Sequence, residues 1–106
     1  MTKFIIENIC NLVIAEGLAE NEGDFCERWL CRGNSYMRTL RFRQLQPSVE
    51  ALTTCADKLG YYAGIFAASD RAQTRVSAGN LRLLERECRA AVERAARERW
   101  QGYSQL

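Results

Sequence analysis

Residues 25–60 read FCERWLCRGNSYMRTLRFRQLQPSVEALTTCADKLG, and this stretch decides the fold of the chain. Two breaks divide it. Gly33-Asn34 suits a tight turn, and Pro47-Ser48 combines a residue that fixes the backbone with a natural helix N-cap. The predicted helices span about residues 24–31, 34–43 and 48–59. A compact helix pair with a cationic second helix is a layout that places a helix in the DNA major groove.

Apolar residues recur at helical spacing in all three segments, so one face of each helix is expected to be buried. They are Phe25, Cys26, Trp29 and Leu30 in the first, Tyr36, Met37 and Leu40 in the second, and Val49, Leu52, Cys55, Ala56 and Leu59 in the third. Gly60 is read as the end of the third helix. The pattern predicts an all-α protein.

The flanking sequence extends this all-α reading in both directions. A helix is expected over about residues 3–16, with Gly17 as its end. The apolar segment 61–68 predicts a short, largely buried helix, and the polar segment 69–79 predicts a loop or linker. We therefore expect a five-helix domain over residues 1–68, followed by a linker and a long C-terminal helix within residues 69–106.

The C-terminal helix carries an apolar stripe at alternating steps of three and four residues. Its members are Leu81, Leu84, Cys88, Ala91 and Ala95. Two interpretations stay open: the stripe packs onto the domain's own core, or it joins two copies as a homodimer. The position of the helix after a complete five-helix unit favours the homodimer.

Charge is distributed unevenly, although the net charge of the 106 residues is only +2. Every charged residue from Glu7 to Glu22 is acidic, whereas Arg28 to Arg43 contains five arginines and no acid. Arginine pairs well with phosphate, so this block suits nucleic-acid contacts. The alternative is a solvated helix face.

Several function classes are not supported by the sequence. The chain has no histidine, no glycine-rich phosphate loop and no nucleophile elbow, so we expect neither an enzyme nor a cofactor. Five cysteines, an odd number without ligand spacing, predict neither a disulfide framework nor a metal site. No apolar run approaches the roughly 20 residues of a membrane span, and no signal peptide is recognised, so a cytoplasmic protein without a membrane partner is expected.

Redox sensing remains an alternative use of two of these cysteines. Cys26 and Cys31 lie close in sequence, and Arg32 beside Cys31 would lower the pKa of its thiol. The competing interpretation is that the cysteines are reduced and, where apolar spacing places them inward, act as small core residues.

Three short motifs resemble the Cro/C1-type (lambda-repressor-like) helix-turn-helix family over about residues 12–60. They are Ser35-Tyr36-Met37 with Leu40, the segment PSVEAL at 47–52, and the ending CADKLG at 55–60. The family has apolar residues three apart in its recognition helix, then a Pro-Ser-apolar-Glu-x-Leu opening and an Ala-x-x-Leu-Gly ending. Cys31 stands where the family usually has a turn glycine.

The resemblance implies a sequence-specific transcriptional regulator that binds double-stranded DNA through residues 34–43. Base-edge contacts would come from Asn34, Ser35 and Arg38, and phosphate contacts from Arg32, Arg41, Arg43 and Gln44. The alternative is a non-enzymatic protein-interaction module on the same fold, such as an antitoxin-like partner, an inhibitor or an adaptor. The acidic N-terminal third and the small net charge favour that protein partner.

Overall fold

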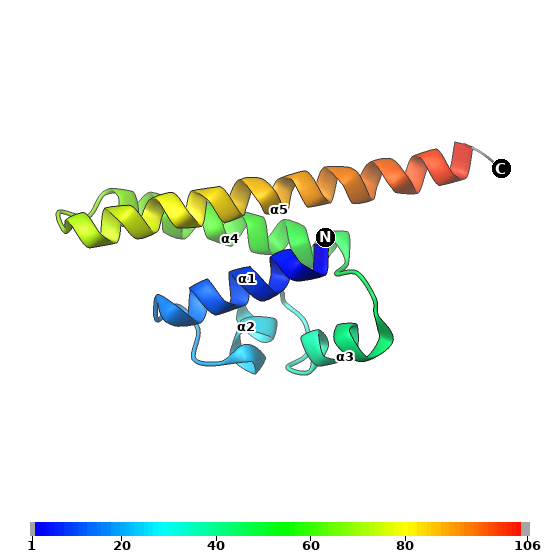
Figure 1. Ribbon diagram of the computed structural model, residues 1–106, viewed down its shortest axis with the longest axis horizontal. Coiled ribbons are helices and arrows are strands. Elements are labelled where there is room, and N and C mark those ends of the chain that lie inside the picture. Colours follow the sequence, from blue (N-terminus) through cyan, green and yellow to red (C-terminus); the bar gives the residue numbers. More distant parts are fainter. Residues whose placement is uncertain (1, 105–106) are drawn as a thin grey trace.

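The computed structural model describes residues 2–104, with side chains described for residues 5–103, and this part of the chain contains helices and no strand (Figure 1). The helices are α1 (Thr2–Ala15), α2 (Glu22–Arg28), α3 (Tyr36–Arg43), α4 (Val49–Ala67) and α5 (Ala72–Ser104). The prediction of an all-α protein with a long C-terminal helix is confirmed.

The helices form one packed unit around a common core. In Figure 1 α5 runs along α4, and α1, which also contacts α5, lies between these two long helices and the short helices α2 and α3. The core takes buried side chains from all five helices, including Ile9 of α1, Met37 of α3 and Leu81 of α5. Helix α3 therefore lies at the edge of the molecule away from α5.

Trp29 is the largest fully buried side chain and joins three parts of the fold. Its ring stacks on Phe25 and Tyr62, at centroid distances of 6.2 and 5.5 Å, and its indole N–H donates to the carbonyl of Leu18 at 3.3 Å. The ammonium group of Lys58 lies 5.1 Å from the ring centroid. The predicted inward face of residues 25–30 is confirmed, since all four of its members are buried.

Local capping sets the ends of the short helices. The side chain of Asn21 accepts the backbone N–H of Asp24 at 2.8 Å at the start of α2. Ser48 does the same for α4, since its Oγ accepts the N–H of Ala51 at 3.1 Å, as predicted. Gly17, just after α1, has a φ of +74° in the left-handed region that suits glycine. These caps fix where the chain turns before α2 and α4.

The predicted helices 48–59 and 61–68 are one continuous helix, α4, so the reading of Gly60 as a helix end is wrong. Gly60 is instead a packing glycine. A Cβ atom placed there would lie 2.7 Å from the carboxylate of Glu85 on α5. The missing side chain lets α5 approach α4 closely, a tertiary requirement that local sequence does not reveal.

The predicted linker 69–79 is also wrong over most of its length, because α5 begins at Ala72. The first turns of α5 are polar in sequence yet take part in packing. Ser77 is buried, and its hydroxyl donates to Glu16 of α1 at 2.7 Å. The described chain therefore has four shorter helices and one long helix, rather than five helices, a linker and a sixth.

Glu85 gives the fold a modest acid sensitivity. Burial raises the pKa of its carboxyl, but hydrogen bonds from Arg82 and Arg89, at 2.9 and 3.0 Å, outweigh it and leave the pKa below its usual value. Ionised Glu85 therefore stabilises the folded state at neutral pH, and this contribution is lost as the pH falls through the lowered pKa.

We expect Glu85→Gln to lower the free energy of unfolding by less than about 1 kcal/mol at neutral pH, since both arginines are about half exposed. The difference between the variant and the wild type should shrink as the pH falls from neutral through the lowered pKa of Glu85, because protonation makes both side chains neutral. Urea unfolding of the two proteins across this pH range measures it. A difference that stays constant with pH would contradict the assignment.

Candidate nucleic-acid interface

The connection between α2 and α3 is a compact turn with an unusual backbone at its centre. Cys31 has a φ of +55°, in the left-handed region that L side chains rarely adopt. The N–H of Arg32 donates to the carbonyl of Cys26 at 2.9 Å and closes the turn onto α2. Cys31 stands where the Cro/C1-type family usually has a turn glycine, and its backbone here has the conformation that suits glycine.

We expect Cys31→Gly to raise the free energy of unfolding by about 0.5–1 kcal/mol, because it relieves the left-handed penalty and this outweighs glycine's larger unfolded-state entropy. Cys31→Ser is the matched control, since it removes the thiol and keeps the Cβ atom. Chemical unfolding of both variants measures the difference. Equal stability of the two would contradict a backbone origin.

The inner face of α3 is attached to the core and to the start of α4. Met37 and Leu40 are 2% and 6% exposed. The hydroxyl of Tyr36 accepts the backbone N–H of Ser48 at 2.9 Å, so the opening of α3 and the N-cap of α4 are directly joined. This attachment holds the outer face of α3 in a fixed orientation.

The outer face collects the residues predicted to contact bases. Asn34, Ser35 and Arg38 are all exposed around the first turn of α3. Ser35 occupies the N-cap position, but its side chain makes no capping hydrogen bond. Its hydroxyl is therefore not used to cap α3, and it is exposed one helical turn before Arg38.

The residues predicted to contact phosphates differ in how far they are exposed and paired within the chain. Arg43 and Gln44 are exposed at the end of α3, and within residues 5–103 neither Arg38 nor Arg43 takes part in an ion pair. Arg32 lies over the ring of Tyr36, 5.7 Å from its centroid, and donates to Ser48 Oγ at 2.9 Å. Its guanidinium also lies 4.0 Å from the carboxylate of Glu50 in the first turn of α4, so its charge is partly compensated inside the molecule.

Arg41 has a different place from the one predicted. Its guanidinium donates to Glu7 of α1 at 2.8 Å and to Glu22 of α2, so it joins three helices. The two hydrogen-bonded carboxylates raise the pKa of Arg41 above its already high usual value. The proposed phosphate contact does not fit this arrangement, because the charge is already compensated inside the molecule.

Phe42 belongs to the outer face of α3 and was missed by sequence reasoning. It is 89% exposed, and Leu45, just after α3, is 46% exposed. The signal was present in the spacing, because Phe42 follows Arg38 by four residues and so lies on the same helix face. The outer face of α3 is therefore cationic and also carries an exposed aromatic side chain.

The cysteines offer one accessible thiol. Cys31 is exposed, whereas Cys26 is fully buried and burial raises the pKa of its thiol. Burial likewise raises the pKa of Cys10 to about 12. A reactive pair of Cys26 and Cys31 is disfavoured, because Cys26 is both inaccessible and poorly ionised.

We expect a small water-soluble disulfide reagent to modify Cys31 rapidly in the folded protein and the other four cysteines only on unfolding. Cys31→Ser should abolish the fast phase. Counting released thiolate by absorbance, with and without denaturant, measures it. Two or more fast thiols in the folded wild type would contradict the burial assigned here.

The predicted dimer stripe of α5 packs mostly within the chain. Leu81, Cys88 and Ala91 are fully buried, while Leu84 and Ala95 are half-buried. The thiol of Cys88 donates to the carbonyl of Leu52 on α4 at 3.2 Å. These residues are therefore better explained by packing onto the chain's own core than by a homodimer, because α4 of the same chain already covers the stripe.

Among the described residues, no cluster of three or more potential metal ligands occurs. In the same part of the chain, no helix has the length and apolar character needed to cross a membrane.

The structure defines a small all-helical protein in which a long C-terminal helix packs along α4 and also contacts α1. The chain belongs to a protein family of unknown function, DUF6626, whose family model matches residues 6–101. No curated protein and no solved structure matches the chain.

Proposed function

We propose that this protein is a cytoplasmic, sequence-specific DNA-binding transcriptional regulator in which α2 and α3 act as a helix-turn-helix motif. The observation that carries the proposal is the outer face of α3. It is exposed, contains no acidic residue, and presents Arg38 and Arg43 outside any ion pair within the described residues. Its inner face is fixed to the core, as a recognition helix requires.

The chemistry of the first turn of α3 fits readout of base edges. Asparagine can bond adenine in a bidentate manner, and arginine can do the same with guanine. Asn34 and Arg38 therefore offer two distinct base preferences. Between them in sequence lies Ser35, whose hydroxyl does not cap the helix. Phe42 adds an apolar group of the kind that contacts the thymine methyl in the major groove.

Phosphate contacts in this proposal come from Arg43, Gln44 and the half-buried Arg32, whose charge is shared with Glu50 at 4.0 Å. Such contacts position a protein on the duplex without reading sequence, and their number sets the salt dependence of binding. With Arg41 internally paired, the set is small, so the expected salt dependence is moderate.

Fluorescence anisotropy with labelled duplexes over a salt series tests the proposal. The duplexes should include a random sequence and sequences enriched by the protein from a random pool. We expect measurable binding at ~50 mM salt, weakening as salt rises, with enriched sequences bound more tightly. Unmeasurable binding at ~50 mM salt would overturn the proposal, since phosphate contacts are stronger there than at physiological salt.

A second candidate is a protein-interaction module that uses the same face of α3. Two observations favour it: Arg41 is neutralised by Glu7 and Glu22, and Phe42 is 89% exposed. Exposed aromatic side chains rimmed by arginine are typical anchors of protein interfaces. Under this alternative the duplexes fail to bind at low salt although the protein is folded.

A further inference from the structure

The last turns of α5 extend beyond the part of the helix that the core covers. Ala91 is the last fully buried residue of α5 in the described chain, and the helix continues to Ser104. This extension carries Trp100 and Tyr103, which are 58% and 79% exposed. The end of this long helix therefore leaves aromatic surface accessible to solvent, above all at Tyr103.

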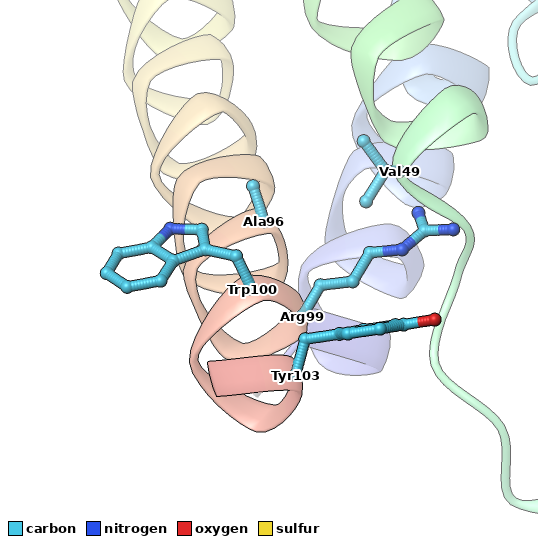
Figure 2. A pocket seen from close by; sticks show the side chains of 5 residues that line it. All are labelled: Val49, Ala96, Arg99, Trp100 and Tyr103. Carbon is cyan, nitrogen blue, oxygen red and sulfur yellow. The ribbon is translucent and has the colours of Figure 1, made fainter. Parts of the chain in front are cut away.

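Two hollows lie next to each other between this end of α5 and the start of α4. The first, of about 330 Å³, is bordered by Val49, Ala96, Arg99, Trp100 and Tyr103. Figure 2 shows Arg99 and Tyr103 lying toward Val49, while Trp100 lies on the other side of Ala96. The second, of about 250 Å³, is bordered by Thr53, Ala56, Arg89, Val92 and Glu93.

The lining residues follow one face of each helix. Val49, Thr53 and Ala56 are spaced at four and three residues along α4, and Val92, Ala96 and Tyr103 share a face of α5. The two hollows thus form a shallow groove, the α4–α5 groove, whose floor is made of small and apolar side chains. An apolar groove of this kind can receive the apolar face of another helix.

We infer that the α4–α5 groove binds the same C-terminal segment of a second copy, with the two α5 helices antiparallel and crossing at Ala96. In such a symmetric pair, a residue n positions before Ala96 faces the residue n positions after it in the other copy. The small side chain of Ala96 permits close approach of the two helices at the crossing. The observation that selects a second copy as the occupant is the charge pattern on either side of Ala96.

This register makes the surface complementary to itself. Glu93 lies three positions before Ala96 and Arg99 three positions after it, so each carboxylate faces a guanidinium of the other copy. Val92 faces Trp100 in the same way, four positions from the crossing. Symmetry repeats both pairs, and neither Glu93 nor Arg99 takes part in an ion pair within residues 5–103. Complementary charge of this kind selects partner and register.

The dimer contact does not rest on the proposed DNA binding, because α3 lies at the far edge of the molecule from α5 (Figure 1). Either property can fail while the other holds. It also differs from the stripe of Leu81, Cys88 and Ala91, which faces the chain's own α4.

Sedimentation equilibrium of the full chain tests the inference. We expect the wild type to reach twice the monomer mass at micromolar concentrations. Glu93→Arg and Arg99→Glu each place like charges opposite one another twice, so each should raise the dimer dissociation constant about tenfold or more. An equimolar mixture of the two variants restores both opposite-charge pairs, so it should form a dimer with wild-type affinity.

Arg94→Glu is the matched control, because position 94 lies on the opposite side of α5 from Ala96 and should leave the dissociation constant unchanged. Circular dichroism should show all variants equally helical, since the changed side chains are exposed. A monomeric wild type overturns the inference, as does a mixture that dimerises no better than the single variants. Equal weakening by Arg94→Glu would overturn the proposed register.

Discussion

Trp29→Ala is expected to lower the free energy of unfolding by about 3–5 kcal/mol, the range for removing a large buried aromatic side chain. Trp29 is fully buried, stacks against Phe25 and Tyr62, and donates its only polar hydrogen to Leu18. The substitution removes contacts to α4 and to the chain after α1, and it leaves the carbonyl of Leu18 without this donor. For a domain of this size the loss is about a fifth or more of a total stability of about 5–15 kcal/mol.

The second tryptophan of the chain supplies the control. Trp100 is 58% exposed, so Trp100→Ala should change the stability of the monomer by less than about 0.5 kcal/mol. Urea unfolding followed by circular dichroism, at concentrations too low for self-association, compares the two variants. A loss below about 1 kcal/mol for Trp29→Ala would contradict its central place in the core.

The features that sequence reasoning recovered are those set by local chemistry. The periodic burial of residues 25–30, the N-cap at Ser48 and the turn at Gly17 each depend on neighbours within one or two helical turns. Such features can be read from spacing because an amphipathic helix displays its buried face at every third or fourth residue.

The features that it missed depend on contacts between distant segments. Gly60 looks like a helix end in sequence, but it faces Glu85 of α5, twenty-five residues later. Residues 72–79 look like a polar linker, yet Ser77 is held by Glu16 of α1. Glycine and polar residues have one set of uses in loops and another in helix packing, and only the tertiary structure decides between them.

In the candidate site, too, the local features could be predicted from the sequence and the long-range contacts could not. Asn34, Ser35 and Arg38 share one helical turn, so their proximity follows from the helix alone. The pairing of Arg41 joins residues 34 and 19 positions apart and could not be anticipated from spacing. Local periodicity thus predicted where the cationic face lies, and long-range packing decided which of its charges are free.

The second large effect is expected from the two free arginines of α3. If the proposed DNA binding holds, Arg38→Ala with Arg43→Ala should weaken binding about a hundredfold at ~50 mM salt. In the proposed assignment Arg43 contacts a phosphate, so its loss should flatten the dependence of log K on log salt by about one. Arg38 contacts a base edge, so its loss should reduce the preference for enriched sequences without a comparable change in that slope. Anisotropy titrations of each single variant and of the double variant, with random and enriched duplexes, separate these two contributions.

The ion pairs of Arg41 suggest a second double variant, which is expected to tighten DNA binding rather than weaken it. Glu7→Gln with Glu22→Gln removes both carboxylates that hold the guanidinium of Arg41 and leaves its exposed face beside Arg38. The change removes two negative charges near α3 and frees the charge of Arg41, so binding should tighten and the salt slope should steepen by up to about one. A solvated surface without a nucleic-acid role would give neither the loss nor the gain. Opposite responses of the two double variants therefore require that DNA lie against this face of α3, whereas a gain without the corresponding loss would indicate only nonspecific attraction to added charge.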